Sequence, residues 1–261
     1  MNRILIAGTH SGCGKTTVTC ALLTALKNRG FHPSAFKCGP DYIDPMFHRR
    51  AIGVTSHNLD PFFCTAEQLK RRIAADAGDV CLLEGAMGYY DGIGPEGRYS
   101  AYDVARETQT PVVLVVDVKG MYASAGAVLR GFSDYRMQSG IRGVIFNNAS
   151  PMLYEGLRSI AEQTGVKPLG FLPRETKVVI ESRPLGLVTA GDIPDLEEKL
   201  ALLGELAERY IDVDGLLALA ACAPAPDVPS LDISPLGSAR IAVARDDAFC
   251  FLYEENLELL T

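Results

Sequence analysis

The sequence predicts an α/β protein built on a doubly wound, mostly parallel sheet, and two patterns point to this fold class. Short apolar runs of strand length alternate with longer stretches of helical periodicity, as expected when parallel strands are joined by crossover helices. The strand-like runs are continuously apolar rather than alternating, which indicates burial on both faces. The expected strands cover residues 3–7, 34–37, 80–83, 112–116, 143–146 and 168–172.

The periodic stretches between these strands are the expected helices. They cover residues 15–28, 66–75, 101–107, 124–137 and 152–164, with two more at 193–210 and 214–221. Asp192 precedes the helix expected at 193–210 and is a suitable residue to begin that helix. Ligands of such sheets bind beyond the carboxyl ends of the strands, and each motif described below falls at such an end.

Composition narrows the possible classes of protein. The chain has 261 residues, a net charge of −7, 48% hydrophobic residues and 22% charged residues, the balance of a soluble globular protein. No basic run favours a nucleic-acid partner, and no apolar run approaches the ~20 residues of a membrane span. Seven cysteines without a Cys-x-x-Cys pair indicate free, buried thiols in a reducing compartment. We therefore expect a cytoplasmic protein without a signal peptide.

Three regions are expected along the chain. Residues 1–222 carry the strand and helix alternation and form the main domain. Residues 223–238 contain four prolines, at positions 224, 226, 229 and 235, and have the composition of a linker. Residues 239–261 begin with a new apolar run at 240–244, which predicts a strand at the start of a further domain.

A glycine-rich stretch, Gly8–Thr17, lies between the first strand and the first helix. This order is that of a phosphate-binding loop, in which backbone N–H groups and the start of the helix surround an anion. Lys15 is expected to reach the outer phosphates, and the Thr16 hydroxyl to hold Mg²⁺. Thr9 stands where the usual spacing has a glycine. The expected nucleotide contacts in this loop are Thr9, Ser11, Gly12, Cys13, Gly14, Lys15, Thr16 and Thr17.

The second strand is followed by paired carboxylates, Asp41 and Asp44, on either side of Tyr42. Beside a phosphate-binding loop, such a pair suits Mg²⁺ or the orientation of a nucleophile, although both are also common turn residues. Lys37, at the end of the strand, is expected to neutralise charge on the transferred group; the alternative is a solvated lysine. His48 and Arg49 are interpreted as a cationic patch for an acidic substrate or as a solvated helix face.

Further polar residues end the later strands. Glu84 follows an apolar run and precedes glycines, a position that favours a magnesium ligand. Asp117 follows the fourth strand and is either a group near the metal or a helix cap. Asn147 follows the fifth strand, and its amide suits the edge of a nucleotide base, with a turn role as the alternative.

These motifs together resemble the cobyrinic acid a,c-diamide synthase family. The resemblance covers essentially the whole chain and rests on Gly8–Thr17, on 37–45, on 58–60, on 84–92 and on Arg183 with 185–187. A wider similarity to dethiobiotin synthetase predicts a P-loop NTPase fold of that type and accounts for Thr9. Two motifs depart from the family pattern: Pro184 replaces a histidine in one, and Tyr89-Tyr90 replace Leu-Phe in the other.

The resemblance implies an ATP-dependent amide ligase. A carboxylate of the corrin macrocycle attacks ATP to give an acyl phosphate, and ammonia displaces phosphate; the c and a side chains are both amidated. Ammonia comes from glutamine through a class I glutaminase domain, and residues 239–261 resemble the truncated start of that domain. The implied catalytic residues are Lys15, Lys37, Asp41, Tyr42 and Asp44, and the implied magnesium ligands are Thr16, Asp41 and Glu84. The expected substrate contacts are Tyr42, Ile43, Asp44, His48, Asn58, Asp60, Gly85, Met87 and Asp91.

Other functions stay open at this point. A related ligase acting on hydrogenobyrinic acid or nickel-sirohydrochlorin fits the same motifs. A switch ATPase of the MinD or ParA type is a different class, but such proteins carry a second lysine early in the loop, where this chain has His10 and Ser11. A homodimer is possible in any of these cases.

Overall fold

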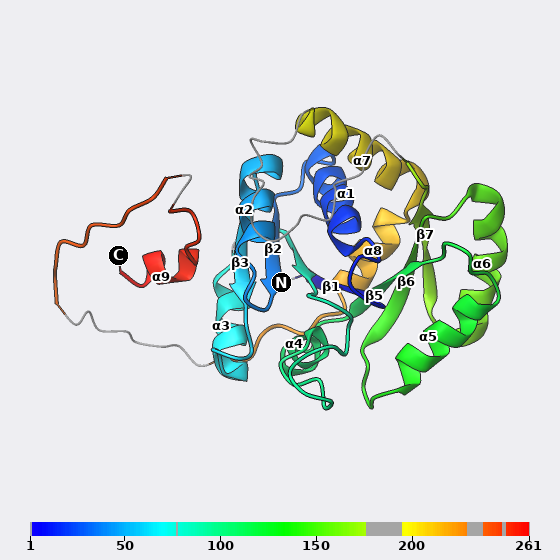
Figure 1. Ribbon diagram of the computed structural model, residues 1–261, viewed down its shortest axis with the longest axis horizontal. Coiled ribbons are helices and arrows are strands. Elements are labelled where there is room, and N and C mark those ends of the chain that lie inside the picture. The colour runs from blue at the N-terminus through cyan, green and yellow to red at the C-terminus, as the bar shows by residue number, and fades with distance from the viewer. Residues whose placement is uncertain (1, 77, 176–194, 229–236, 247–248, 261) are drawn as a thin grey trace.

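The computed structural model describes residues 2–76, 78–175, 195–228, 237–246 and 249–260, and is built around one seven-stranded sheet (Figure 1). The strand order is β3-β2-β4-β1-β5-β6-β7, and every strand pair is parallel. The strands are β1 (Asn2–Gly8), β2 (Pro33–Cys38), β3 (Thr55–Leu59), β4 (Val80–Glu84), β5 (Val112–Asp117), β6 (Ile141–Asn147) and β7 (Lys167–Leu172). The predicted doubly wound fold class is confirmed.

Helices cover both faces of the sheet (Figure 1). One face packs against α1 (Lys15–Asn28), α7 (Leu196–Tyr210) and α8 (Val213–Ala220). The other packs against α3 (Ala66–Ala75), α4 (Ala101–Thr108), α5 (Ser124–Asp134) and α6 (Pro151–Thr164). Ile4 and Ile6 belong to the first core and Leu5 to the second, because successive side chains of a strand point to opposite faces.

The sequence analysis missed the edge strand β3. Its residues, Thr55 to Leu59, are mostly polar, so they lack the apolar run that marked the other strands. The strand forms because it pairs along its length with β2. Two short elements precede it and were also missed, the α-helix α2 (Ile43–Phe47) and the π-helical turn η1 (His48–Ile52).

Helix ends follow familiar capping rules, with one informative exception. Thr65 and Gln68 form a capping box at α3, and Ser150 accepts a hydrogen bond from Leu153 at the start of α6. By contrast, α1 begins after Gly14 without a side-chain cap and without an acidic residue in its first turn. Its first N–H groups are therefore left for another partner.

The C-terminal segment, residues 249–260, contains the short helix α9 (Glu254–Glu258) and packs beside β3. The strand expected at 240–244 is not formed: these residues are exposed and lack regular structure. No described strand lies beside them, and an unpaired strand cannot satisfy its backbone groups. Arg183, the motif at 185–187, the first residues of the helix expected at 193–210 and linker residues 229–236 lie outside the described residues.

Two composition-based expectations can be compared with the structure. All seven cysteines are free; Cys13, Cys20, Cys38 and Cys81 are buried, whereas Cys222 is exposed. Among the helices of the described ranges, none combines the length and apolar character that a membrane crossing requires.

Candidate nucleotide and acceptor site

The phosphate-binding loop connects β1 to α1 at the carboxyl edge of the sheet. Gly12 and Gly14 both adopt positive φ angles, of 82° and 100°, so the loop turns sharply into the helix. Lys15 is buried and folds back over the loop, where its Nζ donates to the carbonyl oxygen of His10 at 3.2 Å. Burial lowers the pKa of Lys15. The uncapped helix start, the turned backbone and this lysine together form an anion site.

Asn147, at the end of β6, contacts the phosphate-binding loop through its side-chain amide. Its Nδ2 donates to the carbonyl oxygen of Cys13 at 3.0 Å, and a Cβ added at Gly14 would lie 2.1 Å from the same nitrogen. The contact explains why position 14 carries glycine. A pocket of about 180 Å³ opens here, lined by Gly12, Gly14, Thr17, Asn147, Asn148, Leu172, Pro173, Glu175, Leu203 and Leu206.

A buried lysine joins the second strand to the fourth. Strand register places Lys37 of β2 between Asn58 of β3 and Glu84 of β4, on the face covered by α1. Lys37 Nζ lies 2.9 Å from Glu84 Oε1 and 2.5 Å from Asp44 Oδ2. Burial would lower the pKa of Lys37, but the charges of Glu84 and Asp44 outweigh it and raise that pKa. The alternative of a solvated lysine is therefore wrong.

Glu84 is the centre of this buried cluster. It is 0% exposed, and its Oε1 also accepts a hydrogen bond from the Thr16 hydroxyl of α1 at 2.6 Å. Burial alone would raise the pKa of Glu84, but Lys37, His48 and Thr16 outweigh it and hold the pKa well below its usual range. The side chain is thus an ionised carboxylate that links the phosphate loop to the lysine.

The two aspartates after β2 have different surroundings. Asp44 is largely buried, and burial together with the charge of Glu84 raises its pKa to about 6. Asp41 instead accepts hydrogen bonds at Oδ1 from the backbone N–H groups of Ile43 and Asp44, at 2.8 and 3.2 Å. Its Oδ2 lies 3.9 Å from Lys37 Nζ. Asp41 therefore shapes the start of α2 while it faces the lysine.

His48 does not lie on a cationic surface, which corrects the expectation that it binds substrate there. It is 0% exposed; its Nε2 lies 3.2 Å from Glu84 Oε2, and its Nδ1 lies 3.2 Å from the Ser56 hydroxyl. The π-helical turn places the ring inward, beneath the carboxylate. Arg49 is half-buried and donates to the carbonyl oxygen of Ser56, so the second member of the expected patch also supports β3.

The donor set beside the phosphate loop fits Mg²⁺. A hydroxyl and an ionised carboxylate, Thr16 and Glu84, are in contact, and Glu84 Oε2 is buried with His48 Nε2 3.2 Å away. Mg²⁺ in nucleotide sites takes one or two such oxygens and completes its shell with phosphates and water. The described residues contain no group of three or more His, Cys, Asp or Glu side chains arranged to hold a metal.

The loop after β4 borders the same edge of the sheet. Gly85 is buried and its carbonyl oxygen lies 3.4 Å from Lys37 Nζ. Met87 is exposed and has a positive φ of 49°. Asp91 Oδ2 accepts a hydrogen bond from the Gly88 N–H, so this carboxylate closes its own loop. After β5, Asp117 Oδ1 accepts hydrogen bonds from Lys119 N and Asn148 Nδ2. Asp117 therefore fixes the loop after the strand, and it is not the expected helix cap, because Ala123 precedes α5.

Asn58 and Asp60, at the end of β3, border a second pocket. Asn58 Nδ2 donates to the carbonyl oxygens of Gly39 and Asp41, at 3.0 and 2.7 Å, and so fixes the loop that carries Tyr42. The pocket has a volume of about 420 Å³ and is lined by Tyr42, Asn58, Asp60, Phe63, Cys64, Tyr253, Glu255 and Asn256.

Tyr253 and Glu255 in this lining were missed by the sequence analysis. They lie about 200 residues from Tyr42 along the chain, and nothing in their spacing indicates that they return to the site.

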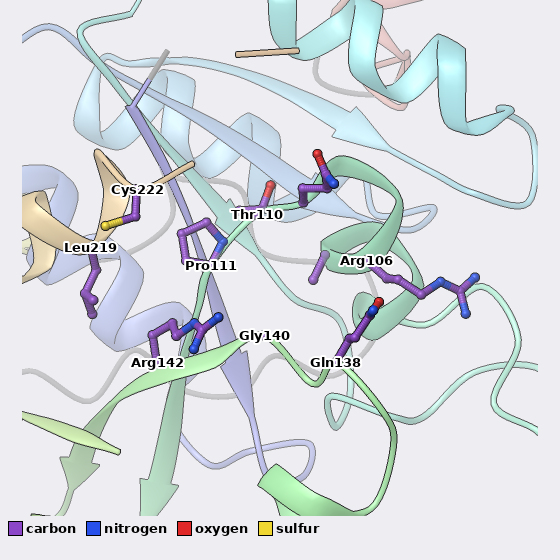
Figure 2. A pocket seen from close by; sticks show the side chains of 10 residues that line it. Arg106, Thr110, Pro111, Gln138, Gly140, Arg142, Leu219 and Cys222 are labelled. Atoms are coloured by element: carbon purple, nitrogen blue, oxygen red, sulfur yellow. The ribbon is translucent and has the colours of Figure 1, made fainter. Parts of the chain in front are cut away.

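A third cavity lies at the opposite end of the sheet, at the start of β5 and β6 (Figure 2). It has a volume of about 470 Å³, and Arg106, Arg142 and Cys222 are among the side chains around it. Ligands of parallel sheets bind at the carboxyl ends of the strands, so this cavity is not part of the phosphate site.

The fold and the loop define a P-loop nucleotide-binding protein. Residues 4–184 match the family described as "CobQ/CobB/MinD/ParA nucleotide binding domain", and the chain belongs to that family. In fold it is similar to the signal recognition particle 54 kDa protein of Aeropyrum pernix in complex with GDP. That structure has 18% identity and a TM-score of 0.50 over 84% of this chain and 49% of the other.

Other relatives have higher sequence identity over nearly the whole chain. The cobyrinate a,c-diamide synthase of Thermoplasma volcanium is 40% identical over 99% of this chain and 57% of its own length. The hydrogenobyrinate a,c-diamide synthase of Rhodobacter capsulatus is 42% identical over 98% of this chain and 59% of its own length. The chain therefore spans somewhat less than 60% of the length of these two relatives.

Proposed function

We propose that this chain is an ATP- and Mg²⁺-dependent amide ligase that converts the c and a carboxylates of cobyrinic acid, or of a closely related tetrapyrrole, into amides. The observation that carries the proposal is the buried cluster of Lys37, Asp44 and Glu84 directly beside the phosphate loop. The names of the relatives, cobyrinate and hydrogenobyrinate a,c-diamide synthase, support the same chemistry.

In the first step, a carboxylate oxygen of the acceptor forms a bond to the γ-phosphorus of ATP while the bond to the β-phosphate oxygen breaks. Two anions must approach each other for this reaction, so their repulsion has to be cancelled where charge develops. Lys15 lies in the loop for the phosphates, and Lys37 lies at the strand end for the acceptor carboxylate. Holding both partners in line removes a large entropic part of the barrier, on the order of 7–11 kcal/mol.

In the second step, ammonia attacks the carbonyl carbon of the acyl phosphate, the carbon–oxygen bond to phosphate breaks, and the nitrogen loses a proton. Asp44 is the group of the cluster suited to take that proton, because its pKa is raised to about 6 and it lies at the acceptor side of Lys37. Glu84, whose pKa is held low, stays ionised throughout. The products are the amide, ADP and inorganic phosphate.

Magnesium has a place in this proposal at Thr16 and Glu84, with phosphate oxygens and water as the other ligands. When bound there, the ion supplies positive charge to the phosphates. Asp41, which the sequence also suggested as a ligand, uses Oδ1 to hold α2. Its role in the proposal is to keep Lys37 and Asp44 in register.

Mass spectrometry of the acceptor tests this function. Purified protein is incubated with ATP, Mg²⁺ and ammonium, and separately with glutamine in place of ammonium, using cobyrinic acid, hydrogenobyrinic acid and nickel-sirohydrochlorin in parallel. Each amidation replaces a hydroxyl by an amino group, and the product masses show whether one or two side chains react. Unchanged acceptor together with ATP hydrolysis stimulated by DNA or lipid vesicles would reject the ligase and favour a switch ATPase.

A further inference from the structure

The C-terminal segment forms one wall of the pocket beside β3, where it contacts the loop that carries Tyr42. The rings of Tyr42 and Tyr253 are stacked, with centroids 4.5 Å apart and planes inclined by 19°. Phe251 approaches the same Tyr42 ring at 5.5 Å. A residue two positions before Asp44 is therefore held between aromatic side chains from the far end of the sequence.

Ionic contacts fasten the segment to the strand. Glu255 Oε1 accepts a hydrogen bond from the Asn58 backbone N–H at 2.8 Å, and it also lies 3.1 Å from Arg72 Nη2 and 3.3 Å from His57 Nδ1. Burial would raise the pKa of Glu255, but His57, Asn58 and Arg72 outweigh it and lower that pKa to about 2. Glu255 is thus an ionised, multiply bonded anchor rather than a free surface carboxylate.

The pocket between these two walls has the character of a small-molecule site. Its volume of about 420 Å³ and its three aromatic side chains, Tyr42, Phe63 and Tyr253, match the size and apolar lining of such sites. One polar atom within it is unexplained: Asp60 is 6% exposed, its Oδ1 accepts from the Phe62 N–H, and its buried Oδ2 has no hydrogen-bond partner.

Position and lining decide which part of which substrate can occupy the pocket. The phosphate loop lies elsewhere on the sheet edge, and Glu255 and Asp60 in the lining repel phosphates and carboxylates alike, so the group that enters is an uncharged ring. A large flat ring that carries its carboxyl groups on flexible arms fits better. The ring covers the aromatic side chains, and a single arm reaches Lys37 while the others stay in water.

We infer that the pocket walled by Tyr42 and Tyr253 binds the apolar ring of the macrocyclic acceptor, and that in the C-terminal segment Tyr253 is an acceptor-binding residue and Glu255 a positioning residue. Tyr253 supplies a ring face, Glu255 fixes the segment to β3, and Asp60 offers its unpaired oxygen to a hydrogen-bond donor of the acceptor, such as a protonated carboxyl group or a newly formed amide. This inference rests on the proposed function, because it takes the acceptor from it.

Direct binding and steady-state kinetics test the inference in the full chain. Binding of the coloured macrocycle is followed by its visible absorption without nucleotide, and amidation is measured over a range of acceptor and ATP concentrations. The substitution Tyr253→Ala is expected to weaken acceptor binding and to raise the KM for the acceptor by about tenfold, because one well-packed ring contact is lost. The KM for ATP stays at the wild-type value. Tyr253→Phe keeps the ring and is expected to bind as wild type.

Leu259→Ala is the matched control, because Leu259 lies in the same segment but is 76% exposed; it is expected to change neither constant. Glu255→Gln is a second variant and is expected to weaken acceptor binding by loosening the segment. A Tyr253→Ala protein with wild-type acceptor affinity and KM, or with only a lower kcat, would overturn the inference. If wild-type protein forms no amide, the proposed function fails, whereas the binding titration still decides whether this pocket holds the ring.

Discussion

Lys37 and Glu84 lie side by side on neighbouring strands, with Nζ and Oε1 2.9 Å apart and both side chains buried. Glu84 also accepts a hydrogen bond from Thr16 at the start of α1. One ion pair therefore connects the phosphate loop to the loop that carries Asp41, Tyr42 and Asp44. We expect this pair to matter both for stability and for the transfer of a phosphoryl group to the acceptor.

Glu84→Gln should destabilise the fold strongly. The substitution leaves the buried Lys37 short of one negative partner, and breaking a buried pair costs about 3–5 kcal/mol. Urea unfolding without nucleotide measures the change in free energy of unfolding. In the double variant Glu84→Gln/Lys37→Met the unpaired charge is removed as well, so the loss should be smaller than the sum of the two single losses. Additive losses would show that the pair is not energetically coupled.

Asp44→Asn should spare nucleotide binding but lower amide formation. In the wild type, the pKa of Asp44 is raised to about 6, so its carboxylate gains a proton as pH falls through that value. At a constant concentration of free ammonia, we therefore expect the rate of amide formation to decline as pH falls through about 6, and this decline to be absent from the residual rate of Asp44→Asn. Loss of ATP and magnesium binding in the variant would instead assign Asp44 to the metal site.

Gly14→Ala should abolish ATP binding while leaving the protein folded. The added Cβ would lie 2.1 Å from Asn147 Nδ2, and the residue holds a φ of 100°, which an L side chain rarely adopts. Isothermal titration with ATP and circular dichroism measure the two properties. Gly30→Ala is the control, because Gly30 also has a positive φ, of 84°, but has no atom within 4 Å of the added Cβ. Normal ATP affinity in Gly14→Ala would refute this geometry.

Asn147→Ala separates two roles for the amide. The sequence favoured contact with the nucleotide base, whereas the structure shows Nδ2 donating to the Cys13 carbonyl oxygen. If the amide acts by holding the loop, affinity for ATP and for inorganic triphosphate should fall together, by about tenfold for one hydrogen bond and its unsatisfied acceptor. A loss confined to ATP would restore the base contact as the main role.

Much of the sheet and the phosphate loop could be predicted from the sequence, for a physical reason. Buried parallel strands such as Val112–Asp117 must be apolar along their whole length, and the phosphate loop requires glycines and a lysine at fixed spacing. The edge strand Thr55–Leu59 was not predicted, because its residues are mostly polar and show no continuous apolar run. The strand expected at 240–244 failed because apolar character alone does not provide a pairing partner.

In the candidate site too, some residues were predicted correctly from the sequence and others were not. Lys37, Asp44 and Glu84 were singled out by their places at strand ends, and the fold brings them together. His48 was expected to face an acidic substrate, and instead lies buried against Glu84, because a π-helical turn directs it inward. Such a turn has no sequence signal as plain as that of a strand or an α-helix.

The sequence by itself determined the doubly wound sheet, the phosphate loop and the identity of the charged residues at the strand ends, because local periodicity and motif spacing encode them. Only the tertiary structure decided which charges meet. The strand register placed Lys37 between Asn58 and Glu84, and the return of the chain brought Tyr253 onto Tyr42. Contacts between residues so far apart depend on how the elements pack in space, which local sequence patterns do not record.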